Sequence, residues 1–209
     1  MHTEPGGKLQ NEDFIIAKAH PRFPEGYVCL LADGQGGQAN GAMAARTACE
    51  TAWRLAASNP FADLLNPDAW TAILAATDTA VAASGGYTTL IGFAAGGNFI
   101  CGASCGDSKV YIKNKTGKIE EITERQRKNP PVGSGEAIFE TYLADIANGS
   151  RLLVVSDGVW KYCGYEAIQK VFESADYSAA PVELRDATAS RSGGKLPDDF
   201  SVIAIMLPP

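Results

Sequence analysis

Short apolar runs, separated by glycine, proline and charged residues, form the main pattern of this chain. Runs of this length between turn-forming residues are typical of buried strands. They occur at 14–17, 27–32, 88–95, 99–105, 109–113, 152–155 and 200–207, and a further short strand is expected at 118–122. The tight turns between 88 and 113 predict an antiparallel meander in the middle of the chain.

Apolar residues at intervals of three and four predict helices over 42–56, 67–81, 164–175 and 182–189. In the first helix, Trp53 falls on the apolar face and is expected in the core. Arg46 and Glu50 lie one turn apart on another face, where they support the helix as an ion pair. Asn66 suits the N-cap of the second helix. Strand pairs and helix pairs in one chain predict two sheets with helices packed outside them.

Length and composition describe an ordinary globular domain. The chain has 209 residues, of which 45% are hydrophobic and 20% charged, and a single domain over 1–209 is expected. Eighteen basic and 24 acidic residues give a net charge of −6, which disfavours nucleic acid and anionic membranes as partners. The opening residues lack an apolar signal core, and no apolar run approaches the roughly 20 residues that span a bilayer, so cytoplasmic residence is expected.

The cysteines give no sign of a disulfide framework or a zinc site. They are five in number, an odd count, and they are scattered without paired C-x-x-C spacing. Free thiols that pack as small apolar side chains are therefore expected.

The chemical signal is a set of aspartates at the ends of apolar strands: Asp13, Asp33, Asp107, Asp157 and Asp198. Taken singly, each is more readily explained as a turn residue or a helix cap. If the strand ends converge, carboxylates about 4 Å apart repel by about 4 kcal/mol at an effective dielectric near 20. Such a cluster needs cations or shared protons.

The nature of the expected ligands selects the cation. Carboxylate and carbonyl oxygens suit hard ions, and neither His2 nor His20 stands at a metal-like spacing. Mg²⁺ or Mn²⁺ is therefore favoured over zinc.

Taken jointly, the motifs resemble those of the type 2C (PPM) metal-dependent serine/threonine protein phosphatase family. The matching segments are Asn11-Glu12-Asp13, Asp33-Gly34-Gln35-Gly36-Gly37, Thr88-Thr89, Gly106-Asp107-Ser108, Ser156-Asp157-Gly158-Val159-Trp160 and Asp198-Asp199-Phe200-Ser201-Val202. Any one of them is a weak signal, whereas their order and their coverage of nearly the whole chain are specific. The chain resembles a compact, bacterial-like member that lacks the usual flap.

The resemblance implies an α+β fold, a four-layer α-β-β-α sandwich of two antiparallel sheets flanked by helix pairs. It also implies a two-metal site at one end of the sandwich. There Asp33 would bridge both ions, the Gly34 carbonyl would bind one, and Asp157 and Asp198 would hold the other.

Further roles follow from the same resemblance. Asp13 or Glu12 would act largely through coordinated water, and Asp107 matches a ligand of a third ion. The implied activity is hydrolysis of phosphoserine and phosphothreonine on proteins by water that Mn²⁺ or Mg²⁺ activates, with Asp33, Asp157 and Asp198 at the catalytic centre. The expected partner is a phosphorylated protein substrate, and the expected state is a monomer.

Three positions depart from the family pattern. Lys8 stands where the family usually has a phosphate-binding arginine, so it is the expected substrate-binding residue, with a point charge in place of a bidentate fork. Gln35 replaces a histidine proposed as a general acid in eukaryotic members, so the leaving group must take its proton from water. Asp199 replaces the usual asparagine; it either strengthens cation binding or is simply exposed.

The largest departure is the shortening between Ile122 and Gly133, where the family usually has a helix and a mobile flap. A basic loop at 125–131 remains. It is interpreted either as a solvated loop or as a segment near the phosphorylated substrate. The shortening itself is either trimming of a surface excursion or an opened cleft for a specialised phosphoprotein.

Two other functions stay open. One is a catalytically silent relative that binds phosphoprotein or cation without turnover, which the changed position 8 and the missing flap favour. The other is a phosphatase of a small phosphorylated metabolite. Retention of Asp13, Asp33, Gly34, Asp157 and Asp198 together argues for an active enzyme.

Overall fold

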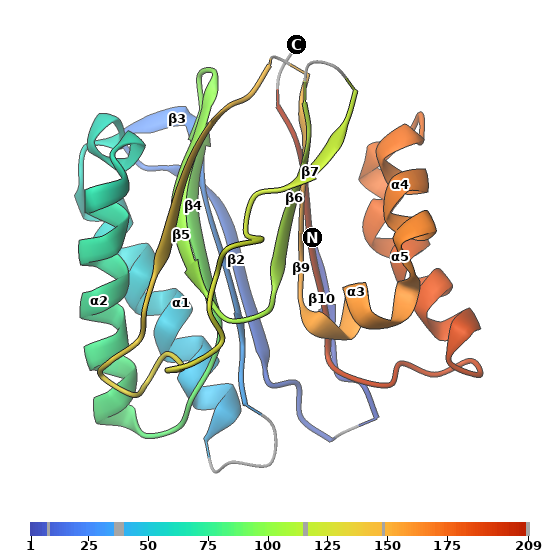
Figure 1. Ribbon diagram of the computed structural model, residues 1–209, viewed down its shortest axis with the longest axis horizontal. Coiled ribbons are helices and arrows are strands. Elements are labelled where there is room, and N and C mark those ends of the chain that lie inside the picture. Colours follow the sequence, from blue (N-terminus) through green and yellow to red (C-terminus); the bar gives the residue numbers. More distant parts are fainter. Residues whose placement is uncertain (8, 36–39, 115–116, 148, 208–209) are drawn as a thin grey trace.

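The structure is a computed structural model, and it describes residues 1–209 except 8, 36–39, 115–116, 148 and 208–209. Two antiparallel sheets of five strands lie face to face in the middle of the molecule (Figure 1). The first sheet holds, in spatial order, β1 (His2–Glu4), β10 (Phe200–Met206), β9 (Arg151–Val155), β6 (Lys109–Lys113) and β7 (Ile119–Glu121). The second sheet holds β2 (Asp13–His20), β3 (Phe23–Asp33), β4 (Leu90–Gly96), β5 (Phe99–Cys105) and β8 (Glu140–Asp145).

Helices cover the outer face of each sheet (Figure 1). Long helices α1 (Gly41–Ser58) and α2 (Pro67–Ser84) pack on the second sheet, joined by the short 3₁₀ helix η1 (Phe61–Leu65). The first sheet is covered by α3 (Asp157–Cys163), α4 (Tyr165–Glu173), η2 (Tyr177–Ala179) and α5 (Ala180–Arg191). The predicted α+β fold, a four-layer α-β-β-α sandwich, is confirmed, with the short α3 added to one helix pair.

The central strands of both sheets are buried on both faces, which explains why they are apolar without alternation. On β3, Leu30 packs toward α1 and α2, whereas the next residue, Leu31, packs between the sheets. On β9, Leu153 packs toward the helices of its own side, whereas Val154 faces the other sheet. Successive strand residues point to opposite faces, so each buried strand supplies two hydrophobic cores at once.

Several expectations about single residues are tested by this packing. All five cysteines are free and buried, as expected. Trp70 is fully buried, but Trp53 is only partly buried, and the ammonium of Lys18 lies 5.3 Å from its ring centroid. Arg46 and Glu50 form the expected ion pair at 3.3 Å.

Strands β1 and β8 and helix α3 were not predicted. Strand β1 has three residues and is defined only by its pairing with β10. Strand β8 is a partly exposed edge strand with an acidic residue at each end, which weakens its apolar signal. Helix α3 has seven residues, too few to show a helical period, and a glycine in its first turn. No helix in the described part of the chain is long and apolar enough to cross a membrane.

The strand registers bring the motif-bearing ends to one end of the sandwich. In the second sheet, Asp13 at the start of β2 pairs with Asp33 at the end of β3. In the first sheet, Val155 at the end of β9 pairs with Val202 near the start of β10 and with Lys109 at the start of β6. The loops that follow β5 and β9 and that precede β10 therefore meet at the same end, where α3 begins (Figure 1).

Candidate functional site

A cavity of about 310 Å³ opens at this end of the sandwich. Four of the carboxylates predicted from the sequence line it, namely Asp33, Asp107, Asp157 and Asp198. The rest of its wall comes from Gly34, Gln35, Thr88, Thr89, Gly106, Lys128, Asn129 and Pro131. The fold thus brings the strand-end aspartates together around one pocket, as the convergence argument requires.

Asp13 lies behind this cavity and is almost fully buried. Its side chain is 5% exposed, and neither carboxylate oxygen has a hydrogen-bond partner among the described residues. The pKa of Asp13 is raised to about 7: burial is the largest cause, the nearby hydroxyls of Ser201 and Ser156 oppose it, and the charges of Asp199 and Asp157 add to it. A buried carboxylate without a partner is costly, so this position favours either a proton or a cation.

Asp33 lies beside Asp13 on the next strand and meets the same conditions. Burial holds its pKa well above the usual range, and the neighbouring charges of Asp13 and Asp157 raise it further. Its backbone is fixed by the Thr88-Thr89 pair: Thr89 Oγ1 accepts from the Asp33 amide at 3.0 Å, and Thr88 Oγ1 donates to the Asp33 carbonyl at 2.9 Å. The two threonines therefore position the aspartate that the sequence places at the centre of the site.

Two glycines allow the close approaches that build the pocket. The Gly34 amide donates to the Glu12 carbonyl at 3.0 Å, and a Cβ at Gly34 would lie 2.3 Å from the Gly41 carbonyl oxygen. A Cβ at Gly158 would lie 2.0 Å from the Asp199 carbonyl oxygen. Side chains at either position would push these segments apart. The glycines of both Asp-Gly motifs are thus explained by backbone packing.

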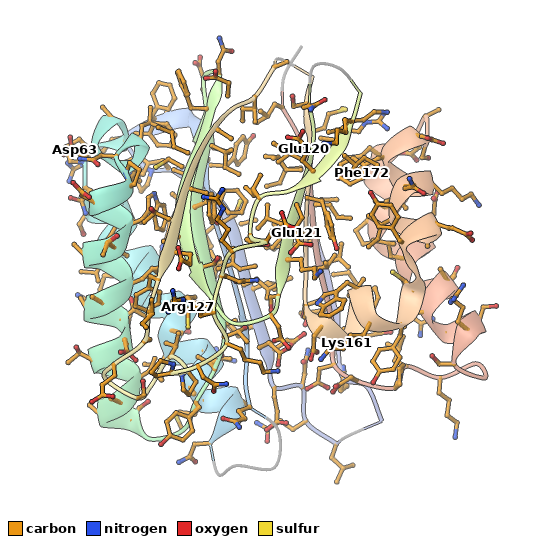
Figure 2. All side chains as sticks on the ribbon, viewed as in Figure 1. Asp63, Glu120, Glu121, Arg127, Lys161 and Phe172 are labelled. Carbon is orange, nitrogen blue, oxygen red and sulfur yellow. The ribbon has the colours of Figure 1, made fainter. Side chains whose placement is uncertain are left out.

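Asp157 and Asp107 are paired with lysines. Lys161, one turn after Asp157 on α3, lies with Nζ 2.6 Å from Asp157 Oδ2 and 3.5 Å from Asp107 Oδ2 (Figure 2 labels Lys161). Lys128 Nζ lies 2.6 Å from the same Asp107 oxygen. Partial burial lowers the pKa of Lys161, but the carboxylates of Asp157 and Asp107 raise it by more. Asp107 as a ligand of a third ion stays a prediction, and two ammonium groups already neutralise its charge.

Neither this lysine pair nor the role of Trp160 was predicted from the sequence. The Trp160 indole donates to the Asp107 carbonyl at 2.9 Å, so the Ser156–Trp160 motif fixes the Gly106–Ser108 turn. The sequence carries only a weak signal for these contacts, namely a lysine close to each of two motif aspartates: Lys109 two residues after Asp107 and Lys161 four residues after Asp157. Lys109 lies over the Trp160 ring, 4.2 Å from the centroid.

Asp198 lines the pocket as predicted, whereas Asp199 is not exposed. Its side chain is 4% exposed and accepts from the backbone amides of Gly6 at 2.9 Å and Glu12 at 2.8 Å. The exposed reading of Asp199 is therefore wrong, because this carboxylate holds the segment that connects β1 to β2. Lys8 belongs to that segment but lies outside the described residues, so its substrate-binding role stays a prediction.

A further buried carboxylate, Asp78 on α2, was not predicted from the sequence. It accepts from the amides of Gly133 at 2.6 Å, Gly135 at 3.3 Å and Ala137 at 3.1 Å. The available signal was the position of this carboxylate: it stands next to Thr77 on the face of the helix that is buried, where an acidic residue needs hydrogen-bond donors. Asp78 anchors the segment that continues the basic loop, which contributes Lys128, Asn129 and Pro131 to the pocket wall.

The donor set fits a hard divalent cation. The pocket offers aspartate oxygens and the Gly34 backbone, and the buried oxygens of Asp13 have no partner among the described residues. Such all-oxygen surroundings suit Mg²⁺ or Mn²⁺. Within the described residues, no three acidic, histidine or cysteine side chains are gathered tightly enough to hold an ion as they stand.

Comparisons with known proteins agree with this geometry. Residues 24–208 match the family described as Stage II sporulation protein E (SpoIIE). No curated protein matches the sequence significantly.

Solved structures of phosphatases share the fold across almost their whole length. The Mycobacterium tuberculosis serine/threonine phosphatase PstP/Ppp is 22% identical with a TM-score of 0.84, over 100% of this chain and 97% of that chain. The catalytic domain of the serine/threonine phosphatase PstP in complex with two manganese ions is 23% identical with a TM-score of 0.82, over 99% and 96%. RsbX in complex with magnesium is 15% identical with a TM-score of 0.76, over 99% and 92%.

At these identities the structural likeness establishes the fold, while the match of residues 24–208 establishes the family. The resemblance drawn from the motifs is confirmed at both levels. The chain belongs to the Stage II sporulation protein E (SpoIIE) family and has the fold of the PPM, or type 2C, serine/threonine phosphatases.

Proposed function

We propose that this protein hydrolyses phosphoserine and phosphothreonine esters on proteins with water activated by divalent cations. The observation that supports it best is a pair of adjacent carboxylates: Asp33, which lines an acidic pocket, and Asp13, which lies behind it. Burial raises the pKa of both, and the oxygens of Asp13 have no hydrogen-bond partner among the described residues. A pair of this kind attracts cations from solution.

Four groups would hold two ions, Mn²⁺ or Mg²⁺. These are the Asp33 carboxylate, the Gly34 carbonyl, and the carboxylates of Asp157 and Asp198, with Asp13 behind them. When bound, such ions lower the pKa of a coordinated water and neutralise charge on the phosphoryl group. The manganese and magnesium ions of the PstP and RsbX structures support this assignment.

The protein's own groups orient the reaction. Thr88 and Thr89 fix the backbone of Asp33, and Lys161 holds the Asp157 carboxylate from the side of α3. Gln35 lines the pocket, and its amide can donate a hydrogen bond but cannot release a proton at neutral pH. The serine or threonine oxygen that leaves the substrate would therefore take its proton from water.

Hydrolysis assays with defined substrates test the proposal. We expect Mn²⁺-dependent release of phosphate from para-nitrophenyl phosphate and from a phosphothreonine peptide, and loss of both activities with a chelator. Asp33→Asn should abolish turnover, whereas Asp63→Asn, an exposed aspartate on η1 far from the pocket, should not.

The other functions left open by the sequence give different outcomes. Binding of the phosphopeptide without turnover would identify a silent module, and hydrolysis confined to small metabolites would identify a different substrate class. A monomeric state and cytoplasmic residence stay predictions that light scattering and cell fractionation test.

A further inference from the structure

Lys128 is the one cationic side chain among the described residues that line the pocket, which also has four carboxylates. Its ammonium lies 2.6 Å from Asp107 Oδ2, and its side chain is 61% exposed. A phosphate monoester carries nearly two negative charges at neutral pH. Such a group entering an acidic pocket needs cations on its own side, and Lys128 is placed to supply one.

The loop that presents Lys128 is tied to the second sheet on both sides of this residue. On one side, the Gly106 amide donates to the Arg127 carbonyl at 2.8 Å. On the other side, the Cys105 thiol donates to the Pro130 carbonyl at 3.4 Å, and Val132 pairs with Thr88. Figure 2 shows Arg127 on the side of this sheet, across the end of the sandwich from Lys161. The backbone at position 128 is therefore preorganised at the pocket wall.

Asp107 can release Lys128 without losing all of its charge compensation. Lys161 Nζ lies 3.5 Å from the same carboxylate oxygen and has a shorter bond to Asp157. Lys161 does not line the pocket, so its charge stays with the two aspartates. The ammonium of Lys128 is the more exposed of the two and can turn toward a bound anion.

We propose that Lys128 binds the phosphoryl group of the substrate and exchanges Asp107 for a phosphate oxygen when the substrate enters. This inference rests on the proposed phosphatase function and names a phosphate-binding residue for it. Of the two interpretations of the basic loop at 125–131, a solvated loop or a segment near the phosphorylated substrate, this inference selects the second.

Two substitutions at position 128 and one control test the inference. Lys128→Gln removes the charge and should raise KM for both para-nitrophenyl phosphate and a phosphothreonine peptide about tenfold, with a smaller change in kcat, because the contact exists before and during the reaction. Lys128→Arg should keep KM within about threefold of wild type. Arg125→Gln removes the same charge from an exposed position of the same loop that does not line the pocket, and it should leave KM unchanged.

Inhibition by inorganic phosphate separates binding from a structural role. Lys128→Gln should weaken this inhibition by the same factor as it raises KM. If the Lys128 ion pair only stabilises the fold, the variant would lower the thermal midpoint and leave the phosphate inhibition constant at the wild-type value, which would overturn the proposal.

Calorimetric titration of inorganic phosphate into the Mn²⁺-loaded protein keeps this test independent of turnover. If wild-type protein shows no hydrolysis, the proposed function fails. The phosphate affinity of Lys128→Gln against Arg125→Gln still decides the role of Lys128, since equal affinities refute it.

Discussion

Four acidic residues in or behind the pocket form two pairs that differ in their neighbours. Asp107 and Asp157 each have an ammonium group within 2.6 Å, so their charges are already compensated. Asp13 and Asp33 instead have other carboxylates as electrostatic neighbours, and burial raises the pKa of both. Cations from solution are therefore attracted most strongly to the Asp13 and Asp33 side of the pocket.

Asp157→Asn is expected to abolish turnover while the fold is kept. The amide has nearly the same volume, but it removes one anionic ligand from the proposed metal site, which should lower kcat at least about a hundredfold. The lost ion pair with Lys161 is a one-turn helix pair and contributes only about 0.5 kcal/mol to stability. Steady-state kinetics at saturating Mn²⁺, with circular dichroism as the check on folding, measure both effects.

The matched control is Asp186→Asn, an exposed aspartate on α5. It should keep wild-type kinetics. If Asp157→Asn keeps most of its Mn²⁺-dependent rate, Asp157 is a strand-end turn residue and does not belong to the metal site.

The stability of the metal-free protein should depend on pH through Asp13. Its pKa rises from 3.8 to about 7 on folding, so between these values the folded protein holds a proton that the unfolded chain has released. The free energy of unfolding should therefore fall as the pH rises from about 4 to about 7. Asp13→Asn should flatten this dependence and should stabilise the metal-free protein at pH 8 by a few kcal/mol.

Urea unfolding at pH 5 and pH 8 with chelator measures these differences. Asp33 contributes in the same direction, because burial and the charge of Asp13 both raise its pKa. A wild-type protein that is equally stable at both pH values would contradict the assignment of a proton to this pair.

At the scale of secondary structure, the sequence predicted what depends on local pattern. Strands such as Leu90–Gly96 are buried over their whole length and so appear as continuous apolar runs. Strand β8 and helix α3 were missed because an exposed edge strand and a seven-residue helix have no strong period. The strand-end aspartates could be found because the motifs keep their order along the chain.

Contacts between distant segments could not be predicted in the same way. Lys128 and Asp107 are 21 positions apart, and Asp78 and Gly133 are 55 apart. Nothing local to Asp78 or Lys128 indicates its partner, because the packing of helix α2 and of the loops on the second sheet brings those partners together. The resemblance to a family supplied the metal ligands, whereas these chain-specific contacts required the structure.

Asp78→Ala should release the segment that follows the basic loop. The substitution removes an acceptor from three backbone amides in 133–137, and hydrogen bonds to a charged group contribute about 1.5 to 3 kcal/mol each. Because these amides are only part-buried, water replaces part of the lost bonding, so we expect a loss of about 2 to 4 kcal/mol in the free energy of unfolding and faster exchange of the amide hydrogens of 132–137. Asp68→Ala, an exposed acidic position in the first turn of the same helix, should cost only a few tenths of a kcal/mol. Unchanged exchange at 132–137 in Asp78→Ala would show that other contacts hold this segment.

At the scale of the whole molecule, the two halves of the sandwich each supply part of the pocket. Asp33 and Gly34 come from the second sheet, whereas Asp157 and Asp198 come from segments that flank the first sheet. An ion held by ligands from both sheets would link the two sheets at the end of the sandwich where the pocket opens. Cation binding and global stability should therefore be coupled.

Millimolar Mn²⁺ is accordingly expected to raise the thermal midpoint of the protein. An ion that binds only the folded state stabilises it by about 2.7 kcal/mol at a hundredfold excess over its dissociation constant. For a chain of this size each kcal/mol corresponds to about 2 to 4 °C, so a rise of about 5 to 10 °C is expected. Scanning calorimetry with Mn²⁺ and with chelator measures the shift, which should shrink in Asp157→Asn and persist in Asp186→Asn. A midpoint that does not move at any Mn²⁺ concentration up to several millimolar would count heavily against a metal site formed between the two sheets. An ion held by carboxylates from both halves binds only the folded protein, and it must therefore raise the midpoint.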